Sequence, residues 1–178
     1  MTLRDFESNN ADQEEYLRSE ANRVMVGADA ESPRKYYVLD IADQTGWKMK
    51  IGIVSSFHGI NPSWIFSADG SVLVIGHDLS ITFIDLAKQR LALVRDLDGV
   101  FFQFIPEMHR SCFVVLHELG VARFEYSGVG LWSVSTPDIA ESAHLRDGET
   151  LVVQHQGPGR EFAIDISTGK IKSNPLKR

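Results

Sequence analysis

Three histidines recur along the chain at similar positions, and their imidazole rings could contribute to one common site. His77, His117 and His155 each end an apolar run and lie 40 and 38 residues apart, and Asp78 and Glu118 directly follow the first two. Imidazole is a common metal ligand, and three imidazoles can hold zinc when their nitrogens converge to about 2 Å from one ion. The pattern leaves three roles open: a metal site, a polar recognition surface, or strand ends that bond the local backbone.

Ser55, Ser56 and His58 form a second group with potential chemistry. Serine catalysis needs a base within hydrogen-bonding reach of the hydroxyl and a third group that orients the base. Asp69 and Asp78 could supply the third group, but the chain contains no Gly-x-Ser-x-Gly nucleophile elbow. We assign no catalytic residue, and a hydrolytic enzyme is kept only as an alternative.

The elements that must position the histidines belong to a repeating unit. Residues 63–91 contain four short apolar runs separated by turns, with Asp69-Gly70 between the first two runs. An Asp-Gly pair flanked by apolar runs predicts a hairpin. The unbroken aliphatic run at residues 72–75 predicts a strand that is covered on both faces. The unit is therefore predicted to be a four-stranded meander.

The same unit returns about every 40 residues. Asp147 precedes His155 by the eight residues that separate Asp69 from His77. An acidic residue also follows an apolar run at four regularly spaced positions, Asp40, Asp85, Glu125 and Asp165. A period near 40 residues with four strands per unit is typical of propeller blades. We expect complete units over about 63–95, 100–135 and 141–173, preceded by the last two strands of another.

The first complete unit resembles the WD-repeat pattern in residues 66–70, in Gly76 and Asp78, and in residues 83–86. The ending at residues 165–170 is similar to blade ends in WD-repeat and quinoprotein-type propellers. The middle unit lacks the Asp-Gly turn, and the Trp-Asp dipeptide of the family is absent. The resemblance covers about residues 36–173 and implies a propeller fold.

The same resemblance implies a binding surface. In WD-repeat propellers the turn between the second and third strands lies on a face that commonly binds partners. By this resemblance the candidate binding residues would line one rim on adjacent blades: His77, Asp78, His117, Glu118 and His155.

Charge and composition limit the class of partner. Lysine and arginine number 18 against 24 acidic residues, so the net charge is −6, which disfavours nucleic acid and anionic membranes as partners. No stretch approaches the roughly 20 apolar residues of a membrane span, and the first residues do not resemble a secretory signal. The single Cys112 cannot form an intrachain disulfide. We therefore expect a cytoplasmic protein that binds another protein and carries no cofactor.

Residues 1–34 are predicted to form an N-terminal arm. Asn10 is a plausible N-cap, and Leu17, Ala21 and Val24 recur at helical spacing, which predicts one helix over about residues 11–25. Small and polar residues then form a linker. The propeller-like domain is expected over residues 35–173, followed by a polar tail at 174–178.

A half-blade and three blades are too few for a closed propeller, which typically has four to eight blades. An open stack exposes strand edges and apolar faces. The arm and tail could cover the ends, several chains could associate as a homo-oligomer, or the chain could be a remnant of a longer propeller. We expect an all-β, partial or open propeller-like stack of four-stranded antiparallel meanders with one N-terminal helix.

The leading functional prediction is a non-catalytic module that recognises another protein through the rim of blade turns. The alternative is a metal-assisted or hydrolytic enzyme centred on the histidines.

Overall fold

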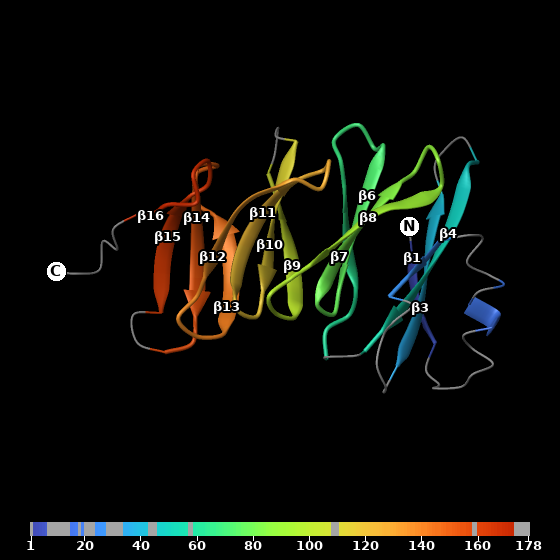
Figure 1. Cartoon of the computed structure of the whole chain (residues 1–178), viewed down its shortest axis with the longest axis horizontal. Helices are drawn as coiled ribbons and strands as arrows, with labels where there is room; N and C mark the ends of the chain where they lie inside the picture. The colour runs from blue at the N-terminus through green and yellow to red at the C-terminus, as the bar shows by residue number, and fades with distance from the viewer. Residues whose placement is uncertain are drawn as a thin grey trace.

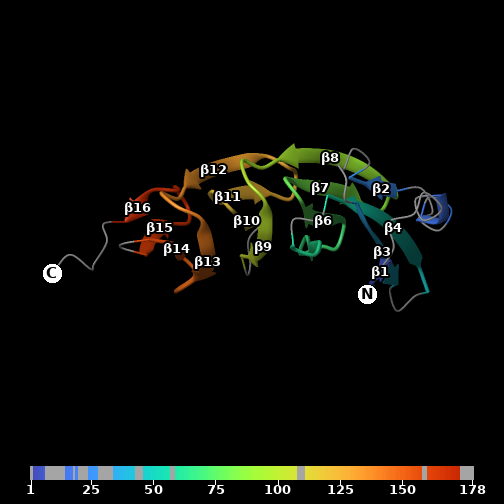
Figure 2. The ribbon, with the colours of Figure 1, turned by 90° about the horizontal axis from the view of Figure 1, so that it is seen from below.

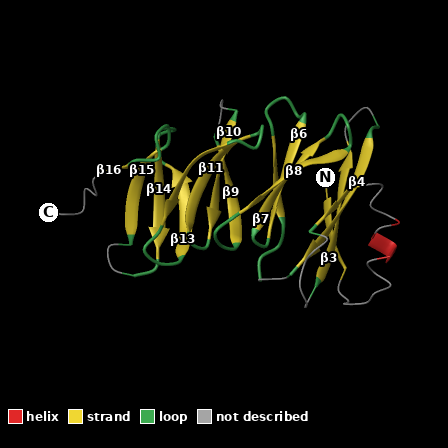
Figure 3. Cartoon of the chain, in the orientation of Figure 1, coloured by secondary structure: helices red, strands yellow, loops and turns green. Residues whose placement is uncertain are grey.

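The computed structural model describes residues 2–6, 15–17, 19, 24–27, 34–42, 46–56, 59–107, 111–157 and 160–172. Within these ranges the chain forms 16 strands, arranged as four sheets of four strands each (Figures 1 and 3). The predicted all-β stack of four-stranded sheets is confirmed. We number the sheets as blades 1 to 4 in chain order.

Blades 2, 3 and 4 are antiparallel meanders whose strands pair in chain order. Blade 2 consists of β5 (Ser63–Phe66), β6 (Val72–His77), β7 (Ser80–Asp85) and β8 (Arg90–Asp96). Blade 3 consists of β9 (Phe101–Pro106), β10 (Cys112–His117), β11 (Gly120–Glu125) and β12 (Gly130–Ser135). Blade 4 consists of β13 (Ala140–Leu145), β14 (Thr150–His155), β15 (Glu161–Asp165) and β16 (Ile171–Lys172). The three predicted units are confirmed.

Blade 1 is a complete sheet and not the predicted half-blade. Its strands are β1 (Thr2–Phe6), β2 (Val24–Val26), β3 (Lys35–Ala42) and β4 (Lys48–Ser55), in the order β1-β3-β4-β2. β1 pairs antiparallel with β3, and β2 pairs parallel with β4. The half-blade prediction was wrong because both outer strands come from the N-terminal arm, where no meander pattern marks them. They pair with backbone groups that β3 and β4 would otherwise expose at their edges.

The N-terminal helix is shorter in the described residues than predicted. Helical backbone covers residues 15–17 and Ser19, whereas Met25 lies in β2. The rest of the predicted helix, the linker at 28–33 and the tail at 174–178 lie outside the described residues. Leu17 is buried in a cluster with Tyr36, Val38 and Val54, so the arm covers the apolar face of blade 1 that points away from blade 2.

The four blades stand side by side in an open arc (Figure 2). β1, β9 and β13 lie on the concave side, and the outermost strands β2, β8, β12 and β16 lie on the convex side. An apolar core fills each of the three spaces between neighbouring blades. Leu73, Val74 and Ile75 are fully buried, which confirms the predicted strand with two covered faces. Blades 1 and 4 are at opposite ends of the arc (Figure 1).

The outer face of blade 4, at the open end, carries mainly polar side chains. Leu151 and Val153 of β14 pack against blade 3, so the alternate residues Thr150, Val152 and Gln154 are on the outer face, where Val152 is itself buried. Lys172 Nζ donates to Thr150 Oγ1 over 2.8 Å, and Ser142 Oγ donates to Gln154 Oε1 over 2.8 Å. Terminal units with a polar outer face are what open repeat arrays require in water. Both ends of the arc are therefore protected, one by the arm and one by polar side chains.

Candidate functional site

The turns that follow β6, β10 and β14 lie at one end of their blades, together with the loops that lead into β9 and β13. We call this surface the turn face; it comprises residues 77–80, 97–100, 117–120, 136–139 and 155–157. It contains the five predicted binding residues. No transmembrane-length apolar helix occurs in the part of the chain that the structure describes.

The three predicted histidines end equivalent strands but are buried beneath the turns. In the described ranges, no three histidine, cysteine or acidic side chains are close enough to hold a metal ion. His77 contacts Asp78 through Nδ1 and the Ser80 hydroxyl through Nε2, at 3.3 and 3.2 Å. His155 Nδ1 is 2.7 Å from the Gln156 carbonyl oxygen. These two imidazoles bond groups of their own turns.

Asp78 connects blade 1 to blade 2. Its carboxylate accepts hydrogen bonds from the Ser55 hydroxyl (2.8 Å) and from the Ser56 backbone N–H (2.9 Å). Burial works to raise the pKa of Asp78, but the hydrogen bonds from His77, Ser56 and Ser55 outweigh it and hold the pKa below its ordinary value. Ser55 and Ser56 therefore have structural partners here, and His58 lies outside the described residues.

The turn after β6 is bonded through its backbone to the loop that leads into blade 3. The Leu97 N–H donates to the Leu79 carbonyl over 2.7 Å, and the Phe101 N–H donates to the Asp78 carbonyl over 2.6 Å. Asp78 has a positive φ of 45°, which the tight turn requires. The turn is thereby held by both neighbouring blades.

The same pair of bonds recurs one blade later. The Thr136 N–H donates to the Leu119 carbonyl over 2.9 Å, and the Ala140 N–H donates to the Glu118 carbonyl over 2.8 Å. Each turn is therefore bonded at two points, once to the connecting loop and once to the first strand of the next blade, and its side chains are presented from a fixed backbone.

The exposed apolar side chains of the turn face are leucines at equivalent positions. Leu79 is 49% exposed and Leu119 is 45% exposed, and Ile139 is also exposed in the loop before β13. Our sequence prediction missed them because it followed the histidines. The repeated order histidine, acid, leucine at residues 77–79 and 117–119 could have identified them. Whether Asp78, Glu118 and the histidines bind a partner stays a prediction.

His117 differs from the other two histidines. It is 2% exposed and its Nδ1 has no hydrogen-bond partner in the described structure. In blade 2 the Nδ1 atom of His77 contacts the Asp78 carboxylate, whereas Glu118, the residue that follows His117, makes no such contact with the His117 Nδ1 atom. The cross-strand neighbour also differs, since Gly120 stands opposite His117 where Ser80 stands opposite His77. A Cβ at Gly120 would lie 2.3 Å from the Val134 carbonyl oxygen, so a serine does not fit there.

We predict that His117 makes the protein less stable in mild acid. Burial lowers the pKa of His117 below its ordinary value of 6.5, and the negative charge of Asp98 opposes this only in part. The unfolded chain then binds the proton more readily, so this contribution is complete above about pH 6.5 and declines as the pH falls toward the lower folded pKa. His117→Gln should flatten the fall in melting temperature between about pH 7.5 and 5, whereas His144→Gln, at an exposed site, should not. Identical pH profiles for wild type and His117→Gln would contradict this.

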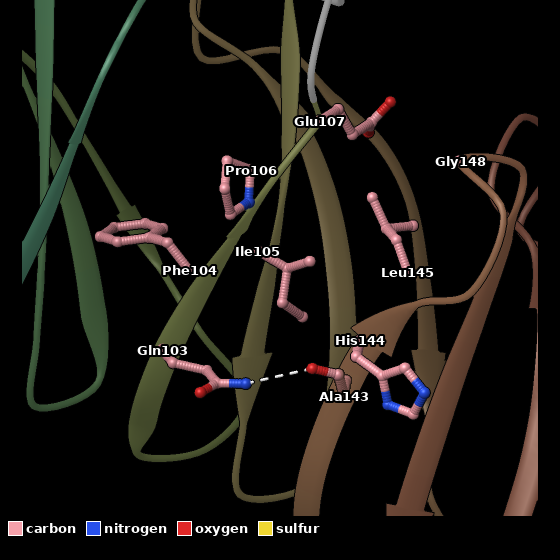
Figure 4. Close-up of a pocket in the computed structure, with 9 residues that line it drawn as sticks. All are labelled: Gln103, Phe104, Ile105, Pro106, Glu107, Ala143, His144, Leu145 and Gly148. Carbon is pink, nitrogen blue, oxygen red and sulfur yellow. Dashed lines mark hydrogen bonds between the residues drawn. The ribbon is translucent and has the colours of Figure 1, made fainter.

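A cleft of about 490 Å³ lies between the inner strands β9 and β13 (Figure 4). Ile105 and Leu145 line it, and the Gln103 amide crosses it to donate to the Ala143 carbonyl over 3.2 Å. Glu107, at one end, is held by Arg123 through two hydrogen bonds. The polar groups of this cleft are thus engaged mainly with the protein itself.

Aspartates in the turns at the opposite end of the blades stabilise those turns. Hydrogen bonds from Ser67 and Ser71 lower the pKa of Asp69 to about 2, and bonds from Ser167 and Thr168 lower the pKa of Asp165 to about 2. These side chains bind N–H and hydroxyl groups of their own turns, which is the role of Asx turns between strands.

No family model matches the chain, and no curated protein matches its sequence. Similar solved structures include hydrazine synthase of Kuenenia stuttgartiensis, with a TM-score of 0.58 and 14% identity over 78% of this chain and 44% of that one. The dihydro-heme d1 dehydrogenase NirN in complex with DHE has a TM-score of 0.57 and 15% identity, over 81% of this chain and 34% of that one. U3-55K has a TM-score of 0.52 and 12% identity, over 65% of this chain and 39% of that one.

The chain spans less than half the length of each of these structures. At such low identity the likeness concerns the fold alone. These structures have propeller folds, and the four four-stranded sheets, three of them antiparallel meanders, agree with them. The chain is therefore a partial, open β-propeller of four four-stranded blades.

Proposed function

We propose that the chain is a non-catalytic binding module that recognises another protein through the turn face. The observation that carries this proposal is the recurrence of an exposed leucine, Leu79 and Leu119, in the same turn of adjacent blades. Exposed apolar side chains that cluster on a surface are typical of protein-binding sites.

The anchored backbone supports the same proposal. Each of the two turns accepts two backbone hydrogen bonds, one from the connecting loop and one from the first strand of the following blade. Side chains on a preorganised backbone lose little further freedom when a partner binds, and this lowers the entropic cost of association. The metal-assisted or hydrolytic alternative has no comparable observation in its favour among the described residues, because its three histidines are buried in separate turns.

We predict that Leu79→Ser combined with Leu119→Ser abolishes partner binding and leaves the fold intact. Each exposed leucine contributes little to folding stability but can contribute about 1 kcal/mol or more to the free energy of binding. The measurement is affinity capture from the native host extract with quantitative mass spectrometry, comparing wild type and variant. The matched control is Leu91→Ser with Leu131→Ser, two exposed leucines on the outer strands β8 and β12. Proteins that are retained by the turn-face variant and lost by the control variant would contradict the proposal.

A further inference from the structure

We infer that the partner presents a lysine or arginine beside an apolar side chain, and that this pair binds where blades 2 and 3 meet. The inference rests on the proposed function and names the chemistry of the partner. Its residues are Leu79 and Leu119, which supply apolar contact, and Asp98 and Glu118, which supply negative charge.

Two carboxylates at this junction have no counter-ion among the residues that the structure describes. Asp98 is exposed in the loop before β9, and Glu118 is half-buried in the turn after β10. Neither side chain has a hydrogen bond or an ion pair with any described residue, unlike Asp78, whose carboxylate is held by Ser55 and Ser56. They remain available to a cation from outside the chain.

The buried base at this junction does not neutralise them. His117 lies in the same turn as Glu118 and interacts electrostatically with Asp98. Its Nδ1 has no partner, and burial keeps its pKa below the ordinary value, so the ring is neutral near pH 7. The junction therefore carries a negative charge that no described residue compensates.

The carboxylates and the leucines belong to one surface. A Cβ placed on Gly99 would lie 3.1 Å from the Glu118 Cβ and 3.2 Å from the Leu119 Cγ, so both side chains lie against the loop that carries Asp98. Leu97, in the same loop, donates its N–H to the Leu79 carbonyl. Charged and apolar groups are thus adjacent.

This combination fits a basic peptide segment. A guanidinium or ammonium group can pair with the carboxylates while its methylene stem covers a leucine. Nucleic acids and anionic lipids are repelled by the same carboxylates. The next junction is less suited to a cation, because the residue that follows His155, equivalent to Glu118, is the uncharged Gln156.

A displayed library of random dodecapeptides tests the inference. Selection on the wild-type chain should enrich peptides with lysine or arginine next to leucine, isoleucine or phenylalanine. Asp98→Asn with Glu118→Gln should weaken an enriched peptide about tenfold at low salt and much less at high salt. Glu15→Gln with Glu149→Gln, which removes the same charge from two exposed sites elsewhere, should leave its affinity unchanged.

The outcomes distinguish a failure of this inference from a failure of the proposed protein-binding function. Two results would overturn the inference and leave the turn face as the binding surface. In the first, the enriched peptides lack basic residues; in the second, they bind Asp98→Asn/Glu118→Gln as tightly as wild type. In both cases the peptides would still fail to bind Leu79→Ser/Leu119→Ser. Peptides that bind both turn-face variants like wild type would overturn both.

Discussion

Replacing Glu107 by alanine is expected to lower the free energy of unfolding by about 3–5 kcal/mol, because it leaves a buried guanidinium without its carboxylate. Arg123 donates to Glu107 Oε1 from Nε over 2.6 Å and to Oε2 from Nη2 over 2.9 Å, and both side chains are buried. These bonds also raise the pKa of Arg123 above its ordinary value, so the guanidinium cannot discard its charge. Urea denaturation monitored by fluorescence measures the loss.

Two further variants make this result specific. Glu107→Met combined with Arg123→Met should recover most of the lost stability, since well-packed apolar residues often replace a buried ion pair without loss. Lys88→Met, which breaks the exposed pair with Asp85, should change stability far less than Glu107→Ala does. A double variant as unstable as Glu107→Ala would show that the unpaired charge is not the cause.

Phe113→Ala is expected to cost about 3–5 kcal/mol, because it opens a cavity in the core between blades 2 and 3. Phe113 is fully buried, and its ring lies 4.9 to 6.1 Å, between centroids, from four other aromatic rings, those of Phe83, Phe104, Phe124 and Tyr126. Phe104 in β9 and Phe124 in β11 belong to the same blade as Phe113 in β10, and Tyr126 directly follows β11. Phe83 lies in β7, which belongs to blade 2. The residue therefore holds two blades together.

The measurement for Phe113→Ala is the same denaturation experiment, with Leu131→Ala on the exposed strand β12 as control. The control should cost less than about 1 kcal/mol, because its side chain is already partly in water. If the two variants lose similar stability, Phe113 does not have the central packing role that its position indicates.

The repeats could be predicted because their pattern is local. The Asp69-Gly70 turn and the aliphatic run after it specify a hairpin and a doubly buried strand within a few residues. The recurrence of this pattern then gives the blade count for blades 2 to 4. No long-range information was needed for these elements.

Blade 1 could not be completed from the sequence. Its outer strands β1 and β2 are separated in the chain from β4 by residues without a meander pattern, and β2 pairs in parallel with its neighbour. Val24 and Met25 also fit a helical spacing, and the choice between helix and strand depended on an exposed sheet edge elsewhere in the chain. Tertiary contacts therefore overrode the local preference.

The rim of turns could be predicted from the sequence, but the two leucines that it exposes were not predicted. The turns that carry His77 and His117 were assigned to one rim, and they do lie at one end of the blades. Their burial depends on the loops of the following blade, which fold over them through backbone bonds that leave no trace in residue type. The exposure of Leu79 and Leu119 has the same origin, since an apolar residue in a turn usually points inward.

The central claim is that four blades form a self-sufficient open arc with both ends protected, which leaves the turn face free. Light scattering across a dilution series tests this most directly. We expect one species with the 19.9 kDa mass of a single chain at every concentration. A stable dimer or larger assembly that persists on dilution would contradict the claim, because the blades would then complete their burial across chains.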